Sequence, residues 1–124
     1  MEGKPMPRML IVEDELALNN CLQEFFKLKG FDVRCAFSAE EALERLADGP
    51  VDVILLDVLL PGQTGIEVLR QVKERSPRVK VIMVTAVDDD AVQETARRYG
   101  ADAVISKPFD FSDATWSRVF AQPS

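Results

Sequence analysis

Four short apolar runs, separated by segments of helical periodicity, limit the folds open to this chain more than any other feature. Each run is mostly rich in β-branched residues, as is typical of buried parallel strands. A fifth segment, from Phe31 to Phe37, alternates apolar and charged residues and suits a less buried edge strand. The four apolar runs are Met9 to Val12, Val51 to Leu56, Val79 to Val84 and Ala103 to Ile105.

Helical segments lie between these predicted strands. The first fills roughly Glu15 to Lys29 and stops at Gly30, a residue common just after helix ends. Capping-box patterns open the second and third helices, which end at a glycine-proline pair and before a proline. These patterns are Ser38 with Glu41 and Thr64 with Glu67, and the stops are Gly49, Pro50 and Pro77.

Two further helices complete the alternation. Three consecutive aspartates, Asp88 to Asp90, crowd the expected start of the fourth helix, where negative charge suits the helix dipole, and Gly100 closes it. The fifth is a short helix over Phe111 to Phe120, with Ser112 as its cap. Its predicted buried stripe is Trp116, Val119 and Phe120.

Strict alternation of strands and helices implies right-handed crossovers and helices on both faces of a parallel sheet. The fold class is therefore α/β, a doubly wound five-stranded sheet. The length of 124 residues suits one domain, 1–124. Its core would cover about 8–121, with 1–7 as a flexible N-terminal tail.

Charge and composition exclude several classes of function. Fifteen Lys and Arg against twenty-one Asp and Glu give a net charge of −6, which argues against direct nucleic-acid binding. No apolar run approaches the ~20 residues that span a bilayer, so neither membrane insertion nor export is expected. The two cysteines, Cys21 and Cys35, are interpreted as small buried hydrophobes of a cytoplasmic protein.

Polar residues follow the predicted strands in a selective way. In open parallel sheets, ligands bind beyond the carboxyl ends of the strands, so these residues should share one edge. Taken singly, an Asp after a strand is usually a turn or cap residue. The set comprises Glu13 and Asp14 after the first strand, Asp57 after the third, Thr85 after the fourth, and Lys107 with Pro108 after the fifth.

Clustered carboxylates repel one another unless a cation lies between them. Histidine is absent from the chain, and oxygen ligands alone suit Mg²⁺ or Mn²⁺ rather than zinc. A metal-bound carboxylate can attack phosphorus to form an aspartyl phosphate, while an ammonium group neutralises the phosphoryl oxygens. Phosphoryl chemistry is the function that this set of residues favours.

The sequence resembles the receiver domains of two-component response regulators, the CheY-like family. The stretches RMLIVEDE, ILLDVLLPGQTG, VIMVTA and GADAVISKPF occur in the family's order and at similar spacing. The resemblance implies the flavodoxin-like strand order 2-1-3-4-5. It also implies Asp57 as phosphoacceptor, with Glu13, Asp14, Asp57 and the backbone carbonyl of Leu59 as metal ligands.

The resemblance extends to the residues around the acidic cluster. It implies that Thr85 and Lys107 bind the phosphoryl group, and that the peptide bond before Pro108 is cis and directs Lys107 into the site. Where receivers commonly have a switch aromatic, this chain has Val104. Leu59 and Val87 occupy positions that tune hydrolysis in receivers. Both are apolar and cannot orient an attacking water, so we expect slow dephosphorylation.

By this resemblance the chain is a phosphorylation-operated switch and not an enzyme. Because it has no histidine, its donor must be another protein, a sensor histidine kinase or a histidine phosphotransfer protein. Phosphorylation would change a surface formed by the fourth helix, fifth strand and fifth helix, which binds a downstream effector or a second copy. Only about seventeen residues follow Lys107, so we expect no effector domain within this sequence. The chain would then be either a stand-alone receiver or one excised from a longer protein.

Two other functions are compatible with parts of this pattern. A receiver-like interaction module could act without phosphorylation. A phosphatase of the haloacid dehalogenase class also uses a strand-end Asp and magnesium, but it needs a second Asp two residues later, where this chain has Leu59. A Rossmann-type nucleotide site is disfavoured, because acidic residues rather than a glycine-rich loop follow the first strand.

Overall fold

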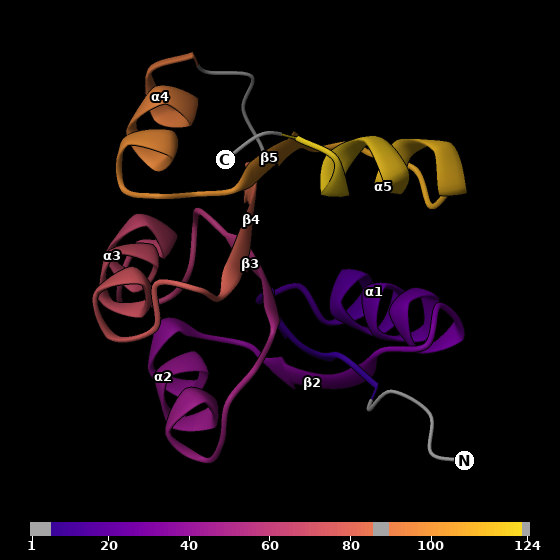
Figure 1. Cartoon of the computed structure of the whole chain (residues 1–124), viewed down its shortest axis with the longest axis horizontal. Coiled ribbons are helices and arrows are strands. Elements are labelled where there is room, and N and C mark those ends of the chain that lie inside the picture. Colours follow the sequence, from indigo (N-terminus) through magenta and orange to yellow (C-terminus); the bar gives the residue numbers. More distant parts are fainter. Residues whose placement is uncertain (1–5, 86–89, 123–124) are drawn as a thin grey trace.

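The computed structural model describes residues 6–85 and 90–122, and within them strands and helices alternate without exception (Figure 1). The strands are β1 (Arg8–Val12), β2 (Asp32–Ala36), β3 (Val53–Asp57), β4 (Lys80–Thr85) and β5 (Ala103–Ser106). The helices are α1 (Leu16–Leu28), α2 (Ala39–Ala47), α3 (Gly65–Arg75), α4 (Asp90–Arg98) and α5 (Asp113–Phe120).

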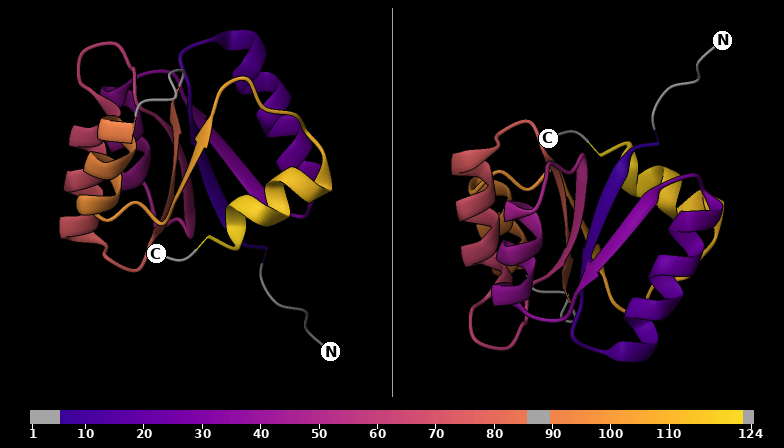
Figure 2. Two further views of the ribbon diagram at one scale, coloured as in Figure 1. Left: turned by 90° about the horizontal axis from the view of Figure 1, so that it is seen from above. Right: turned by 90° about the horizontal axis from the view of Figure 1, so that it is seen from below.

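All strand pairs are parallel, and the strand order is β2-β1-β3-β4-β5. Helices α2, α3 and α4 cover one face of the sheet, while α1 and α5 cover the other (Figures 1 and 2). This arrangement confirms the predicted doubly wound sheet and its order. It also confirms β2 as an edge strand, which is why its residues are less buried than those of β1 and β3.

Alternate residues of the central strands build two apolar cores, one on each face of the sheet. In β1, Leu10 and Val12 pack in the core with residues of α2 and α3, whereas Met9 and Ile11 pack in the core with residues of α1 and α5. The second core is rich in aromatic rings. Phe26 and Trp116 pack edge to face there with ring centroids 5.1 Å apart. Because both faces are covered, the central strands read as continuous apolar runs.

Three of the predicted helix caps are present. The side chains of Ser38, Thr64 and Ser112 accept hydrogen bonds from the backbone N–H groups of Glu41, Glu67 and Thr115. For α4, Asp90 is the first helical residue, while Asp88 and Asp89 lie outside the described residues. Among the described residues, no helix combines the length and apolar character needed to cross a bilayer.

The prediction that both cysteines are buried is wrong. Cys21 is exposed on α1, and Cys35 is half-buried in β2. The buried residues of α1 are Asn19, Leu22 and Phe26, and Cys21 lies about 100° around the helix from Leu22. Cys35 is less enclosed because β2 is an edge strand.

Candidate receiver site

The polar residues predicted at strand ends do lie at one edge of the sheet. Asp57 and Thr85 are the last residues of β3 and β4, and both are buried. Glu13, also buried, and the exposed Asp14 directly follow β1. Lys107 directly follows β5. Parallel pairing of β1, β3, β4 and β5 therefore gathers side chains that are far apart in the sequence.

Lys107 is the centre of this group. Its Nζ lies 2.9 Å from Glu13 Oε1 and 2.9 Å from Asp57 Oδ2. The two carboxylate side chains are only 3% and 4% exposed, so solvent screens these contacts poorly. A single ammonium thus bridges two buried carboxylates that would otherwise repel each other.

The second oxygen of Asp57 is also bonded. Asp57 Oδ1 accepts a hydrogen bond from the backbone N–H of Leu59, with a donor-to-acceptor distance of 3.0 Å. The Leu59 side chain points to solvent, with 63% of the residue exposed. These contacts fix the orientation of the Asp57 carboxylate at the mouth of the site.

Burial and neighbouring charges shift the pKa values of Glu13 and Lys107. Burial, and next the hydrogen bond with Asp57, raise the pKa of Glu13 to about 7. Burial alone would lower the pKa of Lys107, but hydrogen bonds and charges from Asp57 and Glu13 outweigh it, so this pKa is raised. The lysine is therefore a permanent cation in a site that carries an excess of acids.

Glu13, Asp14 and Asp57 fit the requirements of a hard divalent cation. Each offers a carboxylate oxygen, and these oxygens lie within 4.8 Å of one another. With all three carboxylates ionised, these acids and the ammonium group would carry a formal charge of −2, which one divalent ion balances. Oxygen donors of this kind suit Mg²⁺ or Mn²⁺.

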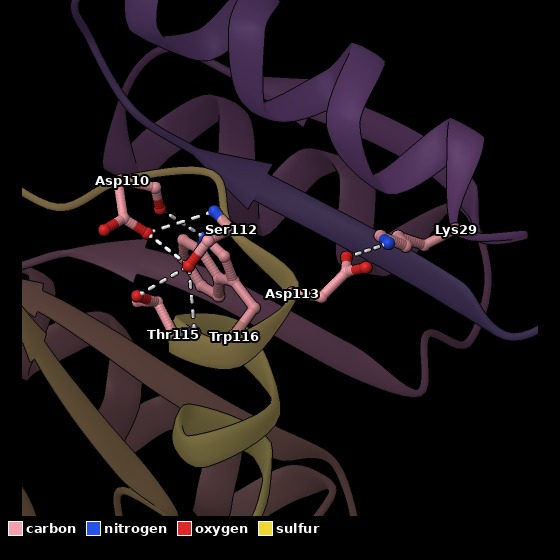
Figure 3. Close-up of polar contacts among 6 residues, drawn as sticks. All are labelled: Lys29, Asp110, Ser112, Asp113, Thr115 and Trp116. Carbon is pink, nitrogen blue, oxygen red and sulfur yellow. Dashed lines mark hydrogen bonds and ion pairs between the residues drawn. The ribbon is translucent and has the colours of Figure 1, made fainter.

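The segment that follows Lys107 is anchored by hydrogen bonds to α5 and by an ion pair. The Lys107–Pro108 peptide bond is cis, as the resemblance implies. The indole N–H of Trp116 donates to the carbonyl of Asp110 at 2.8 Å, and Asp110 in turn accepts from Ser112 (Figure 3). An ion pair from Lys29 to Asp113 ties α5 to α1 in the same view.

The remaining predicted positions differ in their surroundings. Val104 is buried in β5, 8% exposed, and cannot rotate as an aromatic ring would. The backbone carbonyl of Thr85 accepts from the N–H of Lys107 at 2.7 Å, which links the ends of β4 and β5. Val87 lies outside the described residues.

Two residues that shape the site were not identified from the sequence. Gly65 opens α3 against the end of β3, where a Cβ atom would lie 2.0 Å from the carbonyl oxygen of Asp57. Asn19 is fully buried in α1 and bonds the backbone of Glu13. The sequence features that could have indicated Gly65 and Asn19 are a glycine inside a capping motif and a polar residue on the apolar face of a predicted helix.

Comparisons with known proteins agree with this geometry. Residues 9–115 match the model of a family described as the response regulator receiver domain. Among solved structures, a CheY-like response regulator receiver domain protein from Methanospirillum hungatei JF-1 is similar, with 29% identity and a TM-score of 0.86. That match covers 92% of this chain and 91% of the other.

Two further solved structures show how widely this likeness extends. The chemotaxis protein CheY4 of Vibrio cholerae has 26% identity and a TM-score of 0.84 over 93% of this chain and 99% of that one. Thermotoga maritima DrrB, an OmpR/PhoB homologue, has 29% identity and a TM-score of 0.83 over 93% of this chain and 51% of that one. With its strand order, its strand-end acids and a family match over most of its length, the chain belongs to the CheY-like receiver domains of two-component response regulators.

Proposed function

We propose that Asp57 accepts a phosphoryl group from a phosphohistidine on a sensor histidine kinase or a histidine phosphotransfer protein. Receiver domains are regulatory phosphoacceptors, and the observation that supports this role here is the buried Asp57 carboxylate beside an acidic pair and a fixed ammonium. The proposal makes the chain a signalling switch rather than a catalyst acting on a free substrate.

The transfer itself is an exchange of one bond for another. A carboxylate oxygen of Asp57 attacks phosphorus, the phosphorus-nitrogen bond of the donor breaks, and its electron pair returns to the imidazole nitrogen of the donor. Glu13, Asp14, Asp57 and the backbone carbonyl of Leu59 would hold Mg²⁺. Bound there, Mg²⁺ neutralises charge on the phosphoryl oxygens.

Lys107 and Thr85 would bind the new phosphoryl group. Lys107 already pairs with Asp57 Oδ2, so its ammonium needs only a short movement to pair with a phosphoryl oxygen instead. We assign the Thr85 hydroxyl a hydrogen bond to the same group. Such local changes bias a bistable surface. Because Val104 carries no ring, that change would pass through Thr85 and the start of α4.

The output surface would be formed by α4, β5 and α5, and it would bind an effector domain, an effector protein or a second copy of the chain. This chain spans about half of DrrB, 51%, which shows that receivers also occur within longer regulators. Amide hydrogen exchange with and without a beryllium fluoride phosphoryl mimic tests the assignment. Unchanged exchange across these three elements would contradict it.

Dephosphorylation should be slow without a partner. The exposed Leu59 side chain has no polar group that could orient a water molecule. The side chain of Val87, an apolar residue by sequence, has none either. The variant Leu59→Asn supplies such a group and should shorten the lifetime of the phosphorylated form.

Labelling with a small phosphodonor tests the central proposal. In the presence of Mg²⁺ and acetyl phosphate, intact-mass measurement should show one added phosphoryl group on the wild type and none on Asp57→Asn. Equal labelling of the variant would place the acceptor elsewhere. Absence of labelling in both, with a cognate kinase as well, would favour a receiver-like module that works without phosphorylation.

A further inference from the structure

Asn19 is the one fully buried residue of the described chain whose side chain is an amide, and this amide bonds the backbone of Glu13. It belongs to the first turn of α1, and its backbone N–H donates to the carbonyl of Glu15 at 2.9 Å. An amide has a high cost of burial unless its donors and acceptor are bonded. The partners of Asn19 therefore indicate what the residue does.

The two donors of the Asn19 amide meet two backbone carbonyls. Nδ2 lies 2.9 Å from the carbonyl oxygen of Glu13 and 3.2 Å from that of Ala36. The Ala36 carbonyl also accepts from the N–H of Glu13 at 3.1 Å. Asn19 thus closes the last rung of the β1–β2 ladder and connects it to α1.

The Glu13 carbonyl belongs to the peptide group that joins Glu13 to Asp14. A bond to this carbonyl restricts ψ of Glu13 and φ of Asp14, the two dihedral angles that together set the relative directions of the acidic side chains. One of them is buried against Lys107 and Asp57, while the other is exposed, so the two directions differ. A hydrogen bond that holds this peptide plane therefore holds the relative placement of two metal-ligating groups.

A second amide supports the first. Asn19 Oδ1 accepts from Gln23 Nε2 at 2.8 Å, one turn further along α1. With this acceptor occupied, the amide of Asn19 keeps its Nδ2 directed at the two carbonyls. Among the hydrogen bonds of the described residues, Asn19 meets Glu13 at its backbone carbonyl and Gln23 meets Asn19, so their effect would pass through the backbone.

We propose that Asn19 is a positioning residue that preorganises Glu13 and Asp14 for divalent cation binding. This inference rests on the proposed function, since it assumes that the acidic pair binds Mg²⁺. Outer-shell hydrogen bonds of this kind commonly change metal affinity by roughly 10- to 100-fold. Removal of the Asn19 donors should therefore weaken cation binding by roughly tenfold, with a smaller effect on the phosphorylation rate at saturating Mg²⁺.

The test uses Asn19→Leu, which keeps the approximate volume of the side chain and removes its donors. Asn20→Leu is the matched control, because Asn20 is the exposed neighbour on the same helix. A second control, Val119→Ala in the buried face of α5, lowers stability at a distance from the site. Mn²⁺ broadening of backbone amide resonances measures cation affinity, and amide exchange of Glu13 in metal-free protein reports on the backbone.

In Asn19→Leu, half-maximal broadening should require roughly tenfold more Mn²⁺, and the Glu13 amide should exchange its hydrogen faster. Both controls should resemble the wild type in these two measurements. Wild-type affinity in Asn19→Leu would overturn the proposal. So would an equal loss in Val119→Ala, which would show a general effect of stability. If Asn19→Leu does not fold, Asn19→Ala, with higher helix propensity and less bulk, is judged by the same outcomes.

Failure of the proposed function gives a different result. In that case the wild type itself shows no site-specific broadening at Glu13, Asp14 and Asp57, or binds the cation without becoming phosphorylated. Cation binding by the wild type, together with an unaltered Asn19→Leu, rejects the positioning role alone.

Discussion

At the residue scale, Gly65, the first residue of α3, shows how closely this helix approaches the end of β3. The N–H of Gly65 donates to the carbonyl of Val58 at 2.7 Å, and the missing Cβ leaves room for the carbonyl of Asp57. Any larger residue would have to displace backbone rather than a flexible side chain. The close approach of α3 to β3 therefore helps to set where Asp57 points.

The variant Gly65→Ala should lose about 2–3 kcal/mol of unfolding free energy, because the added methyl group meets backbone atoms. Urea denaturation measures this loss, and acetyl phosphate labelling should slow as well. Gly49→Ala is a suitable control, since its Cβ would meet only the end of the Arg8 side chain at 3.6 Å. Similar stability losses in both variants would contradict the argument from close approach.

The raised pKa of Glu13 gives the metal-free protein a distinctive pH dependence. Burial and Asp57 raise this pKa from 4.5 to about 7, so between these values the folded state binds more protons than the unfolded state. The contribution of Glu13 to stability is then complete below pH 4.5 and is lost as the pH rises to about 7.

Urea denaturation across this pH range, with a chelator present, measures the effect. The difference in unfolding free energy between wild type and Glu13→Gln should fall with rising pH, by at most about 1.4 kcal/mol per pH unit. Taking the difference removes the titration of other groups, such as Glu67, whose pKa is lowered by Arg70. A difference that is constant or that rises with pH would refute the assignment.

The site residues at the strand ends could be predicted from the sequence, whereas the residues that hold them in position, Asn19 and Gly65, could not. Asp57, Thr85 and Lys107 follow apolar runs that are visible in the sequence, and parallel pairing then brings them together. Asn19 and Gly65 act through backbone contacts across elements. Such contacts depend on packing distances that no local pattern encodes.

At the element scale, the exposed edge of β5 is closed by a side chain instead of a strand. Gln122, just beyond α5, accepts from the N–H of Val104 at 3.1 Å and donates to its carbonyl at 3.0 Å. Its oxygen also accepts from Arg97 of α4 at 3.1 Å. One amide thus links α4, β5 and the end of α5, and it satisfies backbone groups that an edge strand leaves unpaired.

The variant Gln122→Ala should therefore expose the edge of β5. We expect the Val104 amide to exchange faster, and the unfolding free energy to fall by about 1–2 kcal/mol for the lost hydrogen bonds. Gln122→Glu is the informative partner variant, because it keeps the acceptor for the Val104 N–H and loses the donor to the carbonyl. Unchanged Val104 exchange in Gln122→Ala would show that the edge is protected by other means.

Element boundaries followed the sequence closely where a cap or a stop is local. Ser38, Thr64 and Ser112 cap their helices as predicted, because a capping hydroxyl bonds a backbone group only three residues away. The bonds of Gln122 to Val104 span 18 residues, and no pattern of neighbouring residues indicates them. The error over Cys21 has a similar origin, since the exact face that α1 buries depends on how the helix rotates against the sheet.

At the scale of the whole molecule, the strand order connects a local site to global stability. The acidic groups come from β1 and β3 at the centre of the sheet, and Lys107 reaches them from the edge strand β5. A cation bound by these acids holds together elements that separate only when the sheet unfolds. Because unfolding disperses the ligands, a cation at this site would bind the folded state and stabilise it by mass action.

Thermal and urea denaturation at increasing Mg²⁺ concentration should therefore show a steady gain in stability. For one site that binds only the folded state, the gain is about 2.7 kcal/mol when Mg²⁺ exceeds its Kd a hundredfold. Asp57→Asn removes one negative charge from the site. The plot of unfolding free energy against the logarithm of Mg²⁺ concentration should therefore shift to higher Mg²⁺, with the same slope at saturating concentrations. The same titration with Na⁺ at matched ionic strength separates binding from general screening. A gain equal in wild type, Asp57→Asn and the Na⁺ series would mean that the strand-end acids are not where Mg²⁺ binds.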